Sequence, residues 1–274
     1  QEVLDDPEVD AVYISTPNHM HAEWSIKAAR AGKHILCEKP VTLNAAQLEG
    51  VLEVVRECDV FFMEAFMYRC HPQWERALET MESGAIGQTR IIDAAFSFNF
   101  GYPLDNIRMS NPMGGGGLMD VGCYCVSFAR LMAGEEPEEC EAAAHIGPES
   151  RVDEWATGTL KFPSGAVASL AFGLRCAVPT RATVHGDKGR IDISSPWFPD
   201  DESAKIIVES DGETQTHDIT YGRDLYANEA LTVATHLDDR QAPHMSWNDS
   251  LGQMYALDAL RASMGLEFDG EPKS

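Results

Sequence analysis

The chain has 274 residues, 44% of them hydrophobic, which is enough for two domains or one large domain with a proper core. Asp and Glu outnumber Lys and Arg by 44 to 21, and the formal net charge of -23 would repel nucleic acid and anionic membranes. No run approaches the roughly 18 apolar residues of a membrane helix, and the first residues lack a signal-peptide pattern. We therefore expect a cytoplasmic globular protein that binds neither nucleic acid nor membrane.

The first part of the chain has the pattern of a parallel sheet with crossover helices. Three apolar runs alternate with two helical patterns. They predict strands at 11–16, 34–38 and 60–66, and helices at 21–31 and 44–58. Strand, helix and strand in this order form a parallel crossover unit.

Polar segments follow the first two predicted strands, STPN at 15–18 and EKP at 38–40. Because ligands of parallel sheets bind beyond the carboxyl ends of the strands, we expect both segments to line one crevice. Lys39 precedes a proline, which favours extended backbone, and its amine would project into that crevice. Partial desolvation there can lower its pKa towards values useful in proton transfer. A surface lysine before a helix capped by Thr42 or Asn44 fits the spacing equally well.

After Arg69 the pattern changes to short alternating strands separated by Pro, Gly and Asp turns, which is typical of an antiparallel sheet. Strands are predicted at 90–100, 154–162, 166–174, 182–187, 189–194 and 204–210, and helices at 72–83, 118–134, 227–237 and 249–264. The expected fold class is therefore α/β: part of a parallel sheet over residues 1–66, then a domain with a large open antiparallel sheet over residues 67–274.

A glycine run at 114–117 leads into the segment LMDVGCYC. Asp120 and Tyr124 are four residues apart and share one face of a helix, and the glycines allow another backbone or a ligand to approach its start. Near a lysine amine, such a pair can relay a proton, because the ammonium lowers the pKa of the phenol and the carboxylate orients both groups. From spacing alone, structural roles explain the pattern better: Asp120 would interact favourably with the helix dipole, and Tyr124 would pack in the core.

Other motifs are less informative. His19 and His21 lack a third ligand nearby, so we expect no metal site and assign a cap or cofactor contact instead. The glycine run has no P-loop pattern, and no GxSxG occurs. Arg69 and His71 follow a strand at a helix start, where they could bind a polar substrate or simply cap and pair.

Four motifs occur in order: AVYISTPNHMH, AGKHILCEKP, MEAFMYRCHPQ and GGGGLMDVGCYCV. Together they resemble the glucose-fructose oxidoreductase/inositol dehydrogenase family of NAD(P)-dependent oxidoreductases, over nearly the whole chain. The last two are most similar to the branch with dimeric dihydrodiol dehydrogenases and NADP-dependent xylose dehydrogenases. The resemblance implies a Rossmann doubly wound sheet at 1–66, and a substrate-binding domain at 67–274 that forms homodimers or homotetramers through the outer face of its antiparallel sheet.

The resemblance also implies roles for single residues. Lys39 matches the lysine that contacts the nicotinamide ribose and the substrate hydroxyl, Tyr124 ends the D-x-G-x-x-x-[YH] motif, and Asp120 is the carboxylate before it. Tyrosine at this position is typical of the sugar and dihydrodiol branch, whereas inositol dehydrogenases usually carry histidine. The implied cofactor contacts are Ser15, Thr16, Pro17, Asn18, His21, Glu38 and Lys39, and the implied substrate contacts are Arg69, His71 and Arg108.

The implied activity is hydride transfer between NADP or NAD and a secondary alcohol of a sugar, polyol or trans-dihydrodiol. NADP is favoured over NAD only by the resemblance to this branch of the family. The glycine fingerprint of the family's first strand is absent, so we expect roughly 60 further residues, two strand–helix units, before Gln1. A non-catalytic dinucleotide-sensing relative, a truncated inactive chain and a structural dimerisation domain are the alternatives. The presence of both Lys39 and Tyr124 favours the enzyme.

Overall fold

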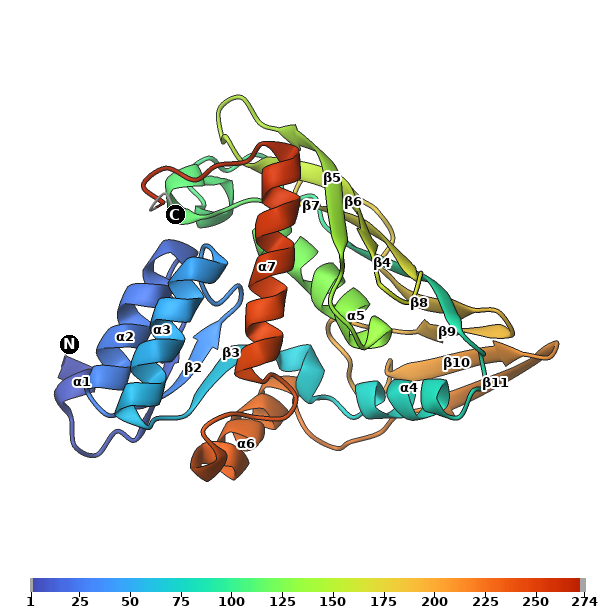
Figure 1. Cartoon of the computed structure of the whole chain (residues 1–274), viewed down its shortest axis with the longest axis horizontal. Helices are drawn as coiled ribbons and strands as arrows, with labels where there is room; N and C mark the ends of the chain where they lie inside the picture. The colour runs from blue at the N-terminus through green and yellow to red at the C-terminus, as the bar shows by residue number, and fades with distance from the viewer. Residues whose placement is uncertain (1, 272–274) are drawn as a thin grey trace.

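The structure is a computed structural model that describes residues 2–271 (Figure 1). A small three-stranded parallel sheet with its helices lies at one side, and a large eight-stranded sheet lies at the other (Figure 1). Helix α7 (Trp247–Met264) runs between them and packs against β3 and α3 of the first part and against β5 of the second. The two sheets are therefore held together by a helix from the end of the chain.

The small sheet has the order β1-β2-β3, with every pair parallel, which confirms the predicted crossover arrangement. Its elements are α1 (Glu2–Asp5), β1 (Ala11–Ile14), η1 (Asn18–Met20), α2 (His21–Arg30), β2 (His34–Glu38), α3 (Ala45–Cys58) and β3 (Phe62–Ala65). Asn44 begins α3 as its N-cap, because its side-chain oxygen accepts a hydrogen bond from the Gln47 N–H at 2.8 Å. Of the two predicted caps, Asn44 is the one the structure uses.

The large sheet has the order β11-β10-β9-β8-β4-β7-β6-β5. Its strands are β4 (Thr89–Ser97), β5 (Glu139–Ile146), β6 (Asp153–Lys161), β7 (Val167–Gly173), β8 (Arg181–Gly186), β9 (Gly189–Ile193), β10 (Lys205–Ser210) and β11 (Glu213–Asp218). All pairs are antiparallel except β4 and β7, which are parallel, so the open sheet is mixed. The two edge strands β5 and β11 were not predicted, because one is rich in alanine and the other is polar throughout.

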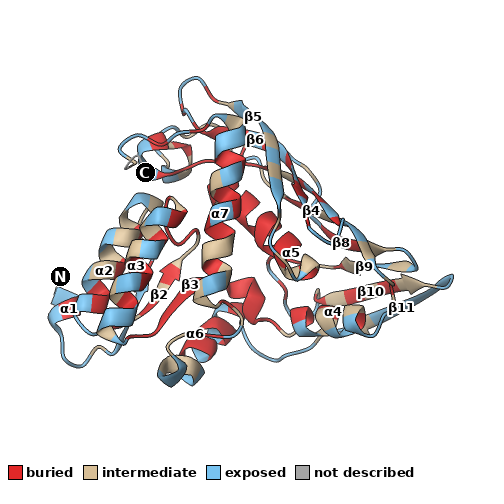
Figure 2. Cartoon of the chain, viewed as in Figure 1, coloured by how far each residue is buried: buried red, intermediate tan, exposed pale blue. Residues whose placement is uncertain are grey.

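Helices cover one face of the large sheet. They are α4 (Gln73–Glu82) against β10, α5 (Cys123–Ala133) against β4, β7 and β8, and α7 against β5. Buried residues gather on these helices and on the strand faces towards them, whereas alternate strand residues are exposed (Figure 2). The remaining elements are η2 (Met67–Cys70), η3 (Ile107–Met109), η4 (Asn111–Met113), the π-helical turn η5 (Leu118–Gly122), α6 (Leu225–His236) and η6 (Leu237–Asp239).

No helix within residues 2–271 combines the length and the apolar character that crossing a membrane would need.

The glycine run brings two backbones together, as its sequence suggested. A Cβ atom placed on Gly115 would lie 2.5 Å from the Arg108 carbonyl oxygen and 2.7 Å from that of Ile107. Such distances are far below a normal carbon–oxygen contact, so only glycine lets η3 lie against the chain that enters η5. The approach fixes where Arg108 and Asp120 meet.

Two glycine-to-alanine substitutions should therefore have opposite effects. Gly50 lies inside α3 with no atom within 4 Å of the added Cβ, so Gly50→Ala should raise the free energy of unfolding by about 0.5–1 kcal/mol. Gly115→Ala should lower it by about 1–3 kcal/mol, because backbone must move. Urea unfolding followed by circular dichroism measures both, and a Gly115→Ala protein as stable as wild type would contradict the close approach.

Candidate active site

The polar ends of β1 and β2 line one pocket of about 400 Å³ together with the segment around η5. This volume is within the range of small-molecule sites in proteins. The pocket thus brings together residues that are about 100 positions apart in sequence. Those predicted residues that line it are Ser15, Thr16, Asn18, Glu38, Lys39, Arg108, Asp120 and Tyr124.

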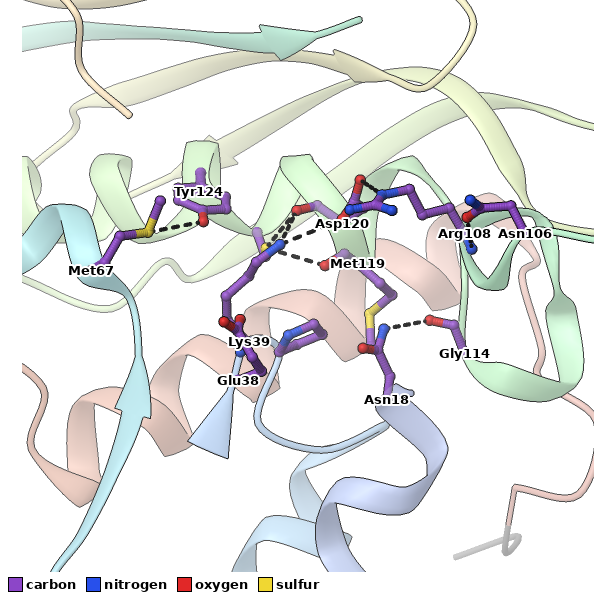
Figure 3. Close-up of polar contacts among 12 residues, drawn as sticks. Asn18, Glu38, Lys39, Met67, Asn106, Arg108, Gly114, Met119, Asp120 and Tyr124 are labelled. Atoms are coloured by element: carbon purple, nitrogen blue, oxygen red, sulfur yellow. Dashed lines mark hydrogen bonds and ion pairs between the residues drawn. The ribbon is translucent and has the colours of Figure 1, made fainter. Parts of the chain in front are cut away.

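Lys39, Asp120 and Tyr124 form one cluster in this pocket (Figure 3). The Lys39 ammonium donates a hydrogen bond to the backbone oxygen of Asp120 at 2.5 Å and lies 3.5 Å from its carboxylate. The same nitrogen lies 4.9 Å from the centre of the Tyr124 ring, while the Tyr124 hydroxyl donates to the Met67 sulfur at 3.2 Å. The cluster joins the end of β2 to η5 and α5, as the sequence predicted for its members.

The pKa values in the cluster differ from the expectation. Burial raises the pKa of Tyr124 well above its usual value, and nearby acidic groups act in the same direction. Burial acts to lower the pKa of Lys39, but Cys123 and the carboxylates of Asp120 and Glu38 outweigh it, so the pKa is raised. The predictions of a lowered lysine pKa and of a phenol acidified by the ammonium were therefore wrong. At neutral pH both groups carry their protons and are hydrogen-bond donors.

Asp120 connects two cations. Its second carboxylate oxygen accepts a hydrogen bond from Arg108 Nε at 2.8 Å, and its first faces Lys39. The carboxylate is only 16% exposed, so two neighbouring positive charges balance its charge in a partly dry site. Arg108 comes from η3, which the glycine run places beside η5. Asp120 therefore orients the lysine, and the Arg108 guanidinium that pairs with it also belongs to the pocket lining.

His21 lies beneath the pocket rather than in its lining. One ring nitrogen is 2.8 Å from the Thr16 carbonyl oxygen and the other is 2.9 Å from that of Pro40. Burial lowers the pKa of His21, so the neutral ring bridges the two polar segments. Pro17 also lies outside the lining, at the entry to η1. His21 therefore holds together the two segments that were expected to contact the cofactor, and neither His21 nor Pro17 lines the cavity itself.

Four further hydrogen bonds fix the segments around Lys39. Asn18 donates a hydrogen bond to the Gly114 carbonyl at 2.8 Å, which ties the end of β1 to the glycine run (Figure 3). The buried Glu64 carboxylate on β3 accepts the Val41 N–H at 3.0 Å, directly after Lys39 and Pro40. Glu38 accepts hydrogen bonds from the Lys39 N–H and from the Tyr13 hydroxyl. Hydrogen bonds thus hold the backbone on both sides of Lys39.

Arg69 and His71 are not brought to the pocket, contrary to the expectation that they contact substrate. The Arg69 side chain is 8% exposed and donates to Ser127 and to the His244 carbonyl, with Asp249 at 3.5 Å. His71 is 2% exposed, and its ring accepts the Gln73 N–H at 3.3 Å. Both cap and pair, which is the other of the two readings left open by the sequence.

Several lining residues were missed by the sequence analysis. Phe96, Phe98 and Met67 form an apolar part of the pocket, and α6 contributes Tyr226 and Glu229. The alternation in AFSFNF places Phe96 and Phe98 on one strand face, and the i, i+3 spacing of Tyr226 and Glu229 places them on one helix face. Neither pattern shows that the face is turned towards a cavity, because that depends on how distant elements pack.

The residues fit the nicotinamide end of a dinucleotide with a small substrate. The Thr16 side chain belongs to the pocket lining, and its buried hydroxyl has no hydrogen-bond partner among residues 2–271. Lys39 and Tyr124 offer protons, and Ser15, Asn18 and Glu38 offer polar atoms at the strand ends. No group of three His, Cys, Asp or Glu side chains in the described part of the chain could hold a metal ion.

Comparison with known proteins gives the same assignment. Residues 1–66 match the model of an oxidoreductase family with an NAD-binding Rossmann fold, and residues 74–192 match the GFO/IDH/MocA C-terminal domain. The chain is 35% identical, over 96% of its length, to D-xylose 1-dehydrogenase (NADP(+)) 2 of Haloferax volcanii, and covers 80% of that protein. It is 33% identical, over 81% of its length, to trans-1,2-dihydrobenzene-1,2-diol dehydrogenase of Xenopus tropicalis, and covers 65% of it.

Among solved structures, KijD10, a 3-ketoreductase from Actinomadura kijaniata in complex with NADP and TDP-benzene, superimposes with a TM-score of 0.88. The two chains are 30% identical, over 96% of this chain and 81% of that one. The protein therefore belongs to the Gfo/Idh/MocA family of NAD(P)-binding oxidoreductases. The chain spans less than two thirds of the length of the Xenopus tropicalis relative.

The buried carboxyl of Glu64 should make stability depend on pH. Burial raises its pKa from 4.5 to about 7. Between these values the folded chain keeps the proton that the unfolded chain loses, so the free energy of unfolding falls as pH rises through this range. Glu64→Gln keeps an acceptor for Val41 but cannot titrate, so the fall should shrink by up to roughly 3 kcal/mol.

Urea unfolding at several pH values measures this difference. The matched control is Glu53→Gln on the exposed side of α3, whose pH profile should run parallel to that of the wild type. A Glu64→Gln profile that also runs parallel would show that folding does not raise the pKa of this carboxyl.

Proposed function

We propose that the protein transfers a hydride between a nicotinamide dinucleotide and a secondary alcohol, or the corresponding carbonyl, of a sugar, polyol or trans-dihydrodiol. The observation that carries this proposal is the Lys39 ammonium held between Asp120 and the Tyr124 ring, at the carboxyl end of β2 and in the lining of a pocket. Residues 1–66 would bind the cofactor, and the rest of the chain would bind the substrate and form the oligomer.

The proton chemistry follows from the state of the two donors. When bound, the nicotinamide supplies the hydride donor or acceptor at C4. Lys39 and Tyr124, both protonated at neutral pH, can donate hydrogen bonds to the reacting oxygen of the substrate and stabilise negative charge that develops there. In the reducing direction one of these two donors gives its proton to the substrate oxygen as the carbonyl carbon takes the hydride, with Asp120 holding the lysine in place. In the oxidising direction the alcohol proton returns to the same group once that group has lost its own proton to solvent.

The substrate class rests on the pocket and the relatives together. The aromatic side chains of Phe96, Phe98 and Phe198 offer apolar surface to a sugar ring or a cyclic diene, and Lys39, Asp120 and Glu229 offer polar contacts to hydroxyls. A xylose dehydrogenase and a dihydrodiol dehydrogenase among the relatives support these two classes. The NADP in the names of the xylose dehydrogenase and the KijD10 complex supports NADP as the preferred cofactor.

Lys39→Met in the complete protein should lower kcat/KM roughly 100-fold to 10,000-fold, because the residue that donates to the reacting oxygen is lost. Turnover of D-xylose, D-glucose and trans-1,2-dihydrobenzene-1,2-diol is followed by absorbance of the reduced nicotinamide, with NADP and with NAD. Lys188→Met, at an exposed site on the turn between β8 and β9, is the control and should retain wild-type activity. Undiminished turnover by Lys39→Met would refute the assignment.

We also propose a homodimer or homotetramer that forms through the outer face of the large sheet. Ile91, Trp155 and Val167 are apolar residues of β4, β6 and β7 that are 39–48% exposed on the chain alone. Trp155→Glu should therefore reduce the apparent mass in size-exclusion chromatography to that of a monomer, because it places a charge in a buried interface. A wild-type chain that already elutes as a monomer would contradict the proposal.

A further inference from the structure

Helix α6 contributes a buried carboxyl to the pocket. Glu229 is 3% exposed and belongs to the pocket lining. Its Oε1 atom has no hydrogen-bond partner among residues 2–271, and no hydrogen bond or ion pair is made by the rest of its carboxyl within that range. Tyr226, one helical turn earlier, lines the same pocket. A polar group in the wall of the site is thus left without an internal partner.

Other buried carboxyls of the chain do have partners. Glu64 accepts the Val41 N–H, Asp153 accepts the Leu118 N–H at 2.6 Å, and Glu154 pairs with Arg175 at 2.6 Å. Leaving a buried carboxyl without any hydrogen bond costs on the order of 1–3 kcal/mol. Among the described residues, one oxygen of Glu64 and one of Asp153 also lack a partner, but of the four carboxyls only Glu229 makes no hydrogen bond at all, and only Glu229 lines the pocket.

The surroundings of Glu229 favour its neutral form. Burial is the main cause that raises its pKa to about 8, and the charge of Glu38 on β2 adds to it. The other titratable groups that interact with it are Tyr13 on β1, Cys70 on η2 and Tyr226 on α6, none of which is a cation. A protonated carboxyl can both donate and accept a hydrogen bond, and it suits an uncharged partner better than an ionic one.

We propose that Glu229 forms a hydrogen bond with an uncharged polar group of the ligand that fills the pocket. Two sources offer this chemistry: a hydroxyl of the substrate and the carboxamide of the nicotinamide. The inference rests on the proposed function for the identity of these ligands. It adds a specificity-determining residue, contributed by α6, to the cluster around Lys39.

Two variants of the complete protein test the role. Glu229→Leu removes the polar group at similar size, and Glu229→Gln keeps a neutral donor and acceptor. If a substrate hydroxyl is the partner, Glu229→Leu should raise KM for D-xylose at least about 10-fold with a smaller change in kcat. Glu229→Gln should stay within about 3-fold of wild type.

Cofactor binding distinguishes the second source. If the carboxamide is the partner, Glu229→Leu should weaken NADPH binding, measured by fluorescence titration, at least about 10-fold. It should also abolish any preference for NADP over its 3-acetylpyridine analogue, which lacks the amide nitrogen. Glu53→Leu, at an exposed position on α3, is the matched control for both measurements and should behave as wild type.

Thermal stability separates binding from a structural role. Removal of an unpartnered buried carboxyl should leave the Tm of Glu229→Leu equal to or above that of the wild type, whereas loss of a structural contact would lower it. Unchanged KM and NADPH affinity in Glu229→Leu, or a Glu229→Gln protein as impaired as Glu229→Leu, would overturn this inference while leaving the proposed function intact. A wild-type protein that turns over and binds none of these compounds would overturn both.

Discussion

The contact between the Lys39 ammonium and Asp120 is the interaction on which the rest of the site depends. It joins the carboxyl end of β2 in the small parallel sheet to η5 in the second part of the chain. The strand ends, the glycine run and α5 converge at this point, so the polar groups of both parts face one cavity. Without it, a lysine at a strand end would be an ordinary surface charge, which is all that its local sequence requires.

The site combines well-held backbone with incompletely satisfied side chains. His21, Asn18 and Glu64 hold the segments on either side of Lys39 through hydrogen bonds to backbone groups. In contrast, Thr16 and Glu229 belong to the pocket lining, and the Thr16 hydroxyl and the Glu229 carboxyl have no partners among the described residues. Rigid supports with unpaired polar atoms at the surface of the cavity are what a preorganised binding site needs, since the ligand then supplies the missing partners.

Local patterns predicted the parallel strands and most of the second sheet. Together with the family resemblance, they also predicted the cluster of Lys39, Asp120 and Tyr124. They could not give the pKa values. The phenol of Tyr124 is surrounded by Phe66, Phe96 and Trp197, and the burial that raises its pKa comes from elements far apart in sequence.

Burial also explains why some residues lie elsewhere than the sequence predicted. Arg69 and His71 have the composition of a substrate site, but they pair with Ser127 and Gln73 inside the fold. Glu229 shows the converse: its helix pattern carries no sign of function, and it reaches the pocket only because α6 packs against η2. Periodicity and spacing define which residues share a face of an element, whereas the tertiary structure determines what that face packs against.

A crystal structure of the complete protein with NADP and D-xylose tests the central claim most directly. The account predicts that the hydroxyl of the reacting carbon lies within roughly 2.6–3.2 Å of both the Lys39 ammonium and the Tyr124 hydroxyl, with the Tyr124 bond to Met67 broken. A sugar bound in this pocket with its reacting hydroxyl in contact with neither group would contradict it.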